Sequence, residues 1–185
     1  MSLLLSGLSV FLLLHLAAVT PALRAALVRV AGEKAWKATV AIGSLAAIAL
    51  VVAGWGDSPA TLLFAPSVAA RQIAPALVSL GLVLFVIGGA GLKGHIRQRL
   101  RHPMLIGVGI WSATHLLANG GLRETLLFGG FLAFSVYALI CLLLSGKRAD
   151  FAPAFKWDAI GIGVGLFVAV GFMHGHRWLF GVAAV

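Results

Sequence analysis

HPMLIGVGIWSATHLLANG, residues 102–120, is the stretch from which the fold of this chain is most directly inferred. Its apolar run has nearly the length of a transmembrane helix, because roughly 20 residues cover the hydrocarbon thickness of a bilayer. Two histidines bracket it, His102 at the start and His115 near the far end. Ionisable side chains at membrane depth are costly and usually face a bundle interior or a cavity. The stretch therefore predicts a membrane-spanning helix with a functional site beside it.

The composition of the whole chain agrees with a membrane protein. Of its 185 residues, 61% are hydrophobic and 10% charged, and the mean hydropathy is +1.07. A soluble domain has about 45–50% apolar and about 25% charged residues. The formal net charge of +9 is expected to reflect basic cytoplasmic loops, and we predict no nucleic-acid partner. The single cysteine, Cys141, excludes an intrachain disulfide and a site with several thiolate ligands.

Six apolar runs predict an all-α, polytopic transmembrane helix bundle that forms a single domain over residues 1–185. The last run is the weakest, because its uninterrupted apolar core, AIGIGVGLFVAVGFM, has only 15 residues, so five spans are the alternative. The first run is expected to be a retained helix rather than a signal peptide, since no positive charge precedes it. The predicted spans are residues 3–20, 38–55, 73–92, 103–119, 124–144 and 158–175.

The basic residues predict the orientation of these spans. Eleven of the fourteen Lys and Arg lie on alternate connections, and short basic loops stay on the cytoplasmic side. Both termini should then lie on the outer side. The eleven are Arg24, Arg29, Lys34, Lys37, Lys93, Arg97, Arg99, Arg101, Lys147, Arg148 and Lys156, against Arg71, Arg123 and Arg177 on the other side. The outer segment 55–75, with three prolines, is expected to be an interfacial loop containing a short helical piece.

Histidines inside the spans are the candidate metal ligands. His15 lies about five residues from the cytoplasmic end of the first span, and His115 lies on the order of 18 Å into the fourth. Histidines from different helices are a typical way for a bundle to hold haem b. The sequence leaves open whether the partner of His15 is His115 or His102. It also leaves open that His115 only cross-links helices through hydrogen bonds.

Polar and aromatic residues follow the same helices. Ser112, His115 and Asn119 share a stripe, and Ser112 or Asn119 could hold the second ring nitrogen of a ligating His115. Phe128, Phe131 and Phe134 recur on the next span. They form either an ordinary packing stripe or the lining of a polyene or porphyrin site. The spacing of Gly161 and Gly165 predicts close helix packing.

RHPMLIGVGIWSATHLLANG (101–120), the FLLLHL segment around His15 and the terminal HRWLFGV resemble the NnrU family of bacterial membrane proteins over essentially the whole chain. The arrangement RHPxxxGxxxWxxxH is similar to that of the plant 15-cis-zeta-carotene isomerase. The RHP element by itself also resembles part of isoprenylcysteine-type methyltransferases and sterol reductases. His176 matches the C-terminal histidine of the NnrU family, although Arg177 stands where many members have proline.

The resemblance implies a multi-pass protein of the bacterial inner (cytoplasmic) membrane that supports nitric oxide reduction in denitrification. Its partners would be the lipid bilayer and the nitric oxide reductase system, and a homo-oligomer is compatible with it. The carotene isomerase implies haem b, with His15 and His115 as ligands and His102 as the substitute. Two alternative functions follow: a haem-dependent polyene cis–trans isomerase, or a methyltransferase- or reductase-like enzyme in which Arg101 and His102 hold an anionic cofactor.

Overall fold

The computed structural model describes residues 1–59, 61–146 and 150–181, with the side chains of 179 and 180 excepted, and the described part is helical. One isolated bridge, between Leu62 and Gly121, is its only β-type pairing. The all-α fold is therefore confirmed. The helices are α1 (Ser2–Val19), α2 (Pro21–Ala31), α3 (Glu33–Gly56), α4 (Val68–Gly89), α5 (His95–Leu100), α6 (Pro103–Ala118), α7 (Leu122–Leu144) and α8 (Phe155–Phe180).

Five helices, α1, α3, α4, α7 and α8, are long and apolar enough to cross a membrane. Many of their large side chains face outward, for example Leu13 at 65% and Phe167 at 79% exposure, as expected of a lipid-facing surface. The prediction that the last span would be the weakest is wrong. Helix α8 has 26 residues because it continues past its apolar core through His174 and His176, whereas α6 has only 16.

Specific residues separate the short helices from the long ones. Thr20 is extended and is followed by Pro21 in the first turn of α2, so the chain bends sharply after α1. Gly32, with φ of +82°, ends α2 and lets α3 begin at once in a new direction. Pro103 opens α6 in the same way, directly after His102. These breaks keep α2 and α5 as short basic helices beside the long spans.

The segment between α3 and α4 differs from expectation. Its described residues contain no helical piece, because the chain here is tied to the turn between α6 and α7. The backbone N–H of Leu63 donates to the Gly120 carbonyl at 2.7 Å, and that of Leu122 donates to the Thr61 carbonyl at 2.8 Å. Helix α4 begins at Val68, earlier than the predicted residue 73, because Ser67 caps it and Pro75 is accommodated inside the helix.

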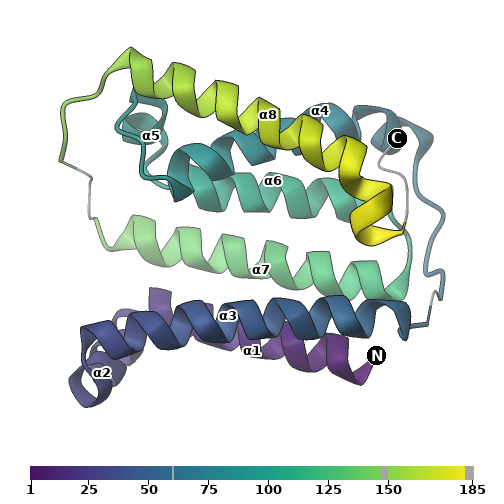
Figure 1. Ribbon diagram of the computed structural model, residues 1–185, viewed down its shortest axis with the longest axis horizontal. Helices are drawn as coiled ribbons and strands as arrows, with labels where there is room; N and C mark the ends of the chain where they lie inside the picture. The colour runs from purple at the N-terminus through teal and green to yellow at the C-terminus, as the bar shows by residue number, and fades with distance from the viewer. Residues whose placement is uncertain (60, 147–149, 182–185) are drawn as a thin grey trace.

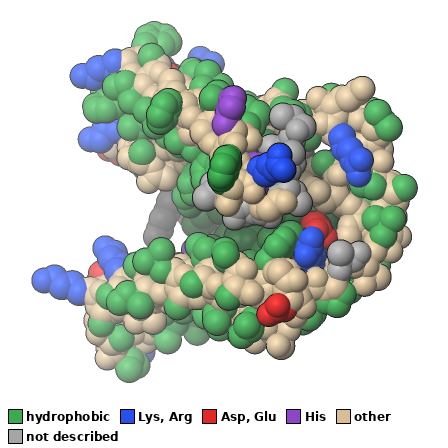
Figure 2. Space-filling model, turned by 45° about the vertical axis from the view of Figure 1, so that its right-hand side comes forward, with side chains coloured by type: hydrophobic (Ala, Val, Ile, Leu, Met, Phe, Trp, Pro, Cys, Tyr) green, Lys and Arg blue, Asp and Glu red, His purple; other side chains and the backbone are tan. Residues whose placement is uncertain are grey.

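The long helices pack in an open row rather than a closed bundle. Neighbours along the row are α3 and α1, α1 and α7, α7 and α6, α6 and α4, and α4 and α8. Figure 1 shows this layering, with α1 and α3 on one side of α7 and α6, α4 and α8 on the other. The space-filling view shows a deep hollow between these two groups, with hydrophobic side chains on its inner wall (Figure 2). We call this feature the hollow.

Close helix approach depends on glycine. A side chain on Gly107 would collide with the backbone of α4 at Gly81, and one on Gly81 would meet the Gly107 carbonyl. A side chain on Gly165 would collide with Val83 of α4, and one on Gly161 would collide with Ile87. The packing role predicted from the spacing of Gly161 and Gly165 is confirmed.

The basic connections gather at one end of the molecule. Figure 1 places α2, α5 and the start of α8 at this end, while the N-terminus and the α3–α4 connection lie at the opposite end. This is the alternation required by the predicted orientation. Two of the basic residues in that prediction, Lys147 and Arg148, lie outside the described residues.

Candidate functional site

His15 lies one turn before the end of α1 with a defined tautomer. Its Nδ1 is 2.9 Å from the carbonyl oxygen of Phe11, and a carbonyl can only accept, so Nδ1 carries the proton. The ring stacks on Phe11 with centroids 4.0 Å apart and meets Phe134 of α7 edge-on at 5.7 Å. This bond leaves Nε2 unengaged, as in a metal-ligating histidine whose other nitrogen is hydrogen-bonded.

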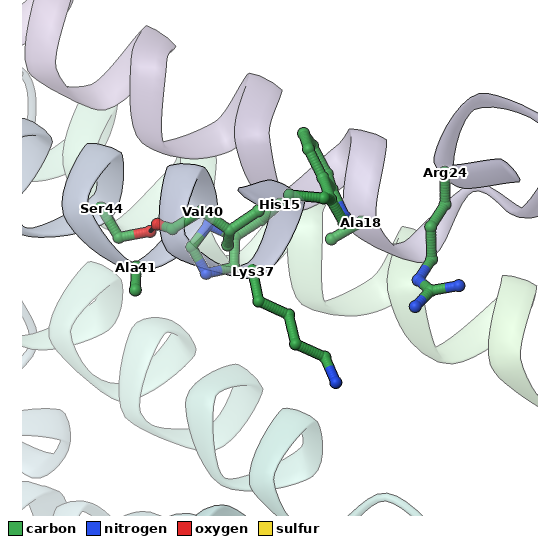
Figure 3. A pocket seen from close by; sticks show the side chains of 8 residues that line it. His15, Ala18, Arg24, Lys37, Val40, Ala41 and Ser44 are labelled. Carbon is green, nitrogen blue, oxygen red and sulfur yellow. Dashed lines mark hydrogen bonds between the residues drawn. The ribbon is translucent and has the colours of Figure 1, made fainter. Parts of the chain in front are cut away.

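A cavity of about 390 Å³ opens beside His15 between α1, α2 and α3. Figure 3 shows the His15 ring among side chains of α3, with Arg24 approaching from α2. The α3 residues occupy positions i, i+3, i+4 and i+7 of one helix face, starting from Lys37. We call this space the His15 cavity; its lining is His15, Ala18, Arg24, Trp36, Lys37, Val40, Ala41 and Ser44.

Two cations and one carboxylate stand at the basic end of the His15 cavity. Glu33 accepts from Arg24 at 2.6 Å and lies 3.3 Å from Lys37. The side chains of Arg24 and Lys37 are 43% and 71% exposed, so water screens this cluster and its pairs add little to stability. One net positive charge remains at the end of an otherwise largely apolar space.

His115, in the last turn of α6, has the same local geometry near the opposite end of the molecule. Its Nδ1 is 2.8 Å from the Trp111 carbonyl, and its ring stacks on Phe128 of α7 at 4.4 Å. Ser112 and Asn119 do not hold this ring: Ser112 donates to the Val108 carbonyl and Asn119 donates to the backbone carbonyl of His115. In a helix the carbonyl four residues back is the nearest acceptor, which explains these bonds.

The structure does not bring His15 and His115 together as two ligands of one ion. Their rings lie against Phe134 and Phe128, six residues apart on α7, which corresponds to about 9 Å along a helix axis. Phe131 lies between, in ring contact with Phe11 at 5.1 Å and with Trp111 at 5.7 Å. The two imidazoles therefore lie beside different parts of the aromatic stripe on α7, with Phe131 between them.

Two further predicted residues lie near these histidines. His176 of α8 is close enough to His115 of α6 for a long-range electrostatic interaction, at the end of the molecule opposite α2 and α5. His102 lies at the opposite end, before α6. Leu105, one turn further on, belongs to the apolar cluster that includes Leu12 and Leu16 of α1. His102 and His15 thus share one end of the molecule.

The Arg101–His102–Pro103 corner has an unusual backbone. Arg101 has φ of +61°, and it is the only non-glycine residue with positive φ in the described ranges. Such a conformation costs of order 1–3 kcal/mol and persists where the surroundings impose it. Nε2 of His102 is buried without a hydrogen-bond partner in the described part of the chain. Burial, and then the positive charge of Arg101, lower the pKa of His102.

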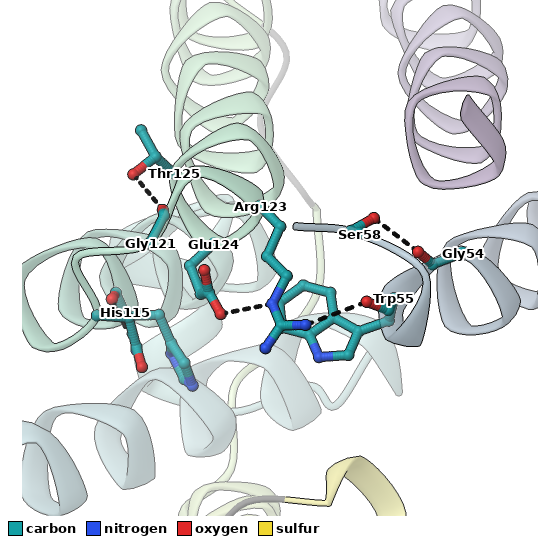
Figure 4. Close-up of polar contacts among 9 residues, drawn as sticks. Gly54, Trp55, Ser58, His115, Gly121, Arg123, Glu124 and Thr125 are labelled. Carbon is teal, nitrogen blue, oxygen red and sulfur yellow. Dashed lines mark hydrogen bonds and ion pairs between the residues drawn. The ribbon is translucent and has the colours of Figure 1, made fainter. Parts of the chain in front are cut away.

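A polar cluster at the end of the molecule opposite α2 and α5 was not among the site residues predicted from sequence. Arg123 Nε pairs with Glu124 at 2.9 Å, its Nη1 donates to the Trp55 carbonyl, and its guanidinium lies 4.7 Å from the Trp55 ring centroid. Figure 4 shows this pair with His115 on the neighbouring α6. Glu124 Oε2 is buried without a partner among the described residues, and Glu124 lines a cavity of about 190 Å³ with Asn119 and Arg71.

The sequence analysis did not identify the α3 lining of the His15 cavity or the Arg123–Glu124 pair, but the sequence contains a signal for each. The stripe Lys37, Val40, Ala41 and Ser44 carries polar ends on an apolar helix face, and the dipeptide Arg123–Glu124 puts two charges in the first turn of a span. No group of three or more His, Cys, Asp or Glu residues in the described ranges lies close enough to hold a metal ion. Of the two cavities described above, the one of about 390 Å³ is lined by a histidine, His15.

Comparison with known proteins supplies the family. No curated protein and no solved structure matches the chain. The family model described as NnrU protein matches residues 3–184, which is nearly the full length and includes His15, His102, His115 and His176. The chain belongs to the NnrU family.

Proposed function

We propose that this chain is a haem b-binding protein of the bacterial inner membrane that supports nitric oxide reduction in denitrification. The observation that carries the proposal is His15: an imidazole with Nδ1 fixed by the Phe11 carbonyl and Nε2 available, beside the His15 cavity. A porphyrin supplies four nitrogen donors to its iron. It therefore needs only one imidazole from the protein, which is what this cavity offers.

The surroundings of His15 suit a flat, mainly apolar group. Trp36, Val40 and Ala41 supply apolar surface to the cavity. The rings of Phe11 and Phe134 pack against the imidazole and hold its orientation. Bound haem would supply one-electron chemistry and an iron site for small diatomic ligands. The link to nitric oxide reduction comes from the resemblance to the NnrU family, and the nitric oxide reductase system is the partner class that it implies.

A second candidate, a haem-dependent polyene isomerase, is favoured by the hollow. Figure 2 shows that its inner wall is hydrophobic, as an elongated polyene would require. Phe131, with ring contacts to Phe11 and Trp111, connects the surroundings of His15 to those of His115. Both candidates require haem, so one measurement tests their common basis.

The test is the absorption spectrum of protein purified in detergent from haem-replete cells. We expect a Soret band in the unchanged protein, its loss in His15→Gly, and its return when imidazole is added to that variant. His174→Gly is the matched control, because His174 makes the same intrahelical Nδ1 bond, to Val170, but is exposed. His115→Gly reports whether His115 also supplies a ligand. Unchanged protein with no Soret band would refute both candidates.

A further inference from the structure

We infer that the His15 cavity holds the acidic edge of a porphyrin, with Arg24 and Lys37 binding its two propionate groups. This inference rests on the proposed haem binding. It assigns a role to Arg24 and Lys37, which the search for an iron ligand does not identify. It follows from three features of the cavity: the position of the cations, the length of the cavity face, and the ion pairs that Glu33 makes with both cations.

The cations stand where the polar edge of an amphiphilic macrocycle must be. Arg24 is in the first turns of α2, beyond the bend at Thr20, and Lys37 is in the second turn of α3. Both lie at the basic end of the molecule, whereas Val40, Ala41 and Ser44 extend the lining further along α3. A porphyrin carries both carboxylates on one edge. Its apolar edge would then point along α3 and its carboxylates toward water.

The length of the cavity face matches this orientation. From Lys37 to Ser44 is seven residues, which corresponds to about 10 Å along α3 and is comparable to the width of a macrocycle. His15 projects from α1 against this same face (Figure 3). An imidazole on one wall and cations at one end would fix both the plane and the rotation of the ring.

Glu33 shows that these cations can engage carboxylates in the required place. It accepts from Arg24 and pairs with Lys37, so one protein carboxylate already bridges both side chains. Two ligand carboxylates would take over these contacts, with the arginine fork able to bind one of them through two nitrogens. Because the pairs are partly exposed, we expect loss of both cations to weaken haem binding about tenfold rather than to abolish it.

Basic residues on this connection also set membrane orientation, so the test needs a control that preserves that role. Arg29 and Lys34 lie on the same connection and are exposed, but they do not line the cavity. The variant pair is therefore Arg24→Gln with Lys37→Gln, compared with Arg29→Gln with Lys34→Gln. Both pairs remove two positive charges from one loop.

The experiment titrates detergent-solubilised apoprotein with haem b and, separately, with haem b dimethyl ester, whose carboxylates are blocked. We expect unchanged protein to bind the free acid about tenfold more tightly than the ester. The Arg24/Lys37 variant should lose this preference and still show a Soret band, while the Arg29/Lys34 variant should retain it. The comparison of the two porphyrins on unchanged protein needs no variant to fold.

Two outcomes overturn the inference in distinguishable ways. Unchanged protein that binds acid and ester equally, or an Arg24/Lys37 variant that keeps the preference, would refute propionate binding and leave haem binding intact. Unchanged protein that binds neither porphyrin would refute the proposed function, and the inference with it.

Discussion

His102, at the basic end of the molecule, has a buried ring nitrogen and a positively charged neighbour. Its Nε2 is buried without a hydrogen-bond partner in the described ranges, and Arg101 beside it has a positive φ. A protonated imidazole there would face both desolvation and a neighbouring positive charge. The fold therefore keeps His102 neutral, which the lowered pKa of this residue expresses.

This lowering makes stability depend on pH. Below about pH 6.5 the unfolded chain takes up a proton at His102 that the folded chain resists, so stability falls as the pH decreases. Above that range both states are neutral and His102 adds no dependence. We expect His102→Gln to reduce the loss of thermal stability between about pH 7.5 and about pH 5.5, measured as the unfolding midpoint in detergent. The control is His174→Gln, at an exposed site. The assignment would be contradicted if the change in unfolding midpoint between the two pH values stayed the same in His102→Gln but differed in His174→Gln.

At the scale of helices, glycine sets the distance between α4 and α6. A Cβ on Gly107 would overlap the Gly81 carbonyl and the Phe85 backbone, while a Cβ on Gly109 would meet only Ser135 at an ordinary 3.7 Å. Gly107→Ala should therefore destabilise the protein by about 1–3 kcal/mol. Gly109→Ala should be neutral or stabilising by up to about 1 kcal/mol, because alanine favours helix. Thermal unfolding in one detergent compares the two, and equal midpoints would show that α4 and α6 do not pack through Gly107.

The helix boundaries were largely predictable, because bilayer thickness fixes the length of an apolar run. Three boundaries lie five residues from the prediction: the starts of α3 and α4 and the end of α8. At α4 the reason is that Pro75 resembled a break while Ser67 supplied the actual cap. The candidate site was less predictable. Periodicity places Lys37 and Ser44 on one face of α3, but it does not say that this face meets His15. Nor does it show that His15 and His115 lie against opposite ends of an aromatic stripe on α7, which depends on pairing between distant helices.

For the whole molecule, the open row of helices and the distribution of charge define its relation to the bilayer. The basic α2 and α5 lie at one end, and the α3–α4 connection lies at the other (Figure 1). Positive loops remain cytoplasmic, so Gln98 on α5 should face the cytoplasm and Ala65 on the α3–α4 connection should face outward. The hollow then opens within the bilayer, where lipid or a bound group can fill it.

This orientation can be measured with single cysteines. In a Cys141→Ala background, we expect a membrane-impermeant maleimide to label Ala65→Cys in intact spheroplasts and Gln98→Cys only after the membrane is opened. Both positions are exposed and uncharged, so neither substitution alters the charge bias that sets the topology. Labelling of Gln98→Cys in intact spheroplasts, with Ala65→Cys protected, would invert the orientation. The His15 cavity, with its two cations, would then lie at the outer face of the membrane. It would not lie at the cytoplasmic face, from which the cell supplies haem.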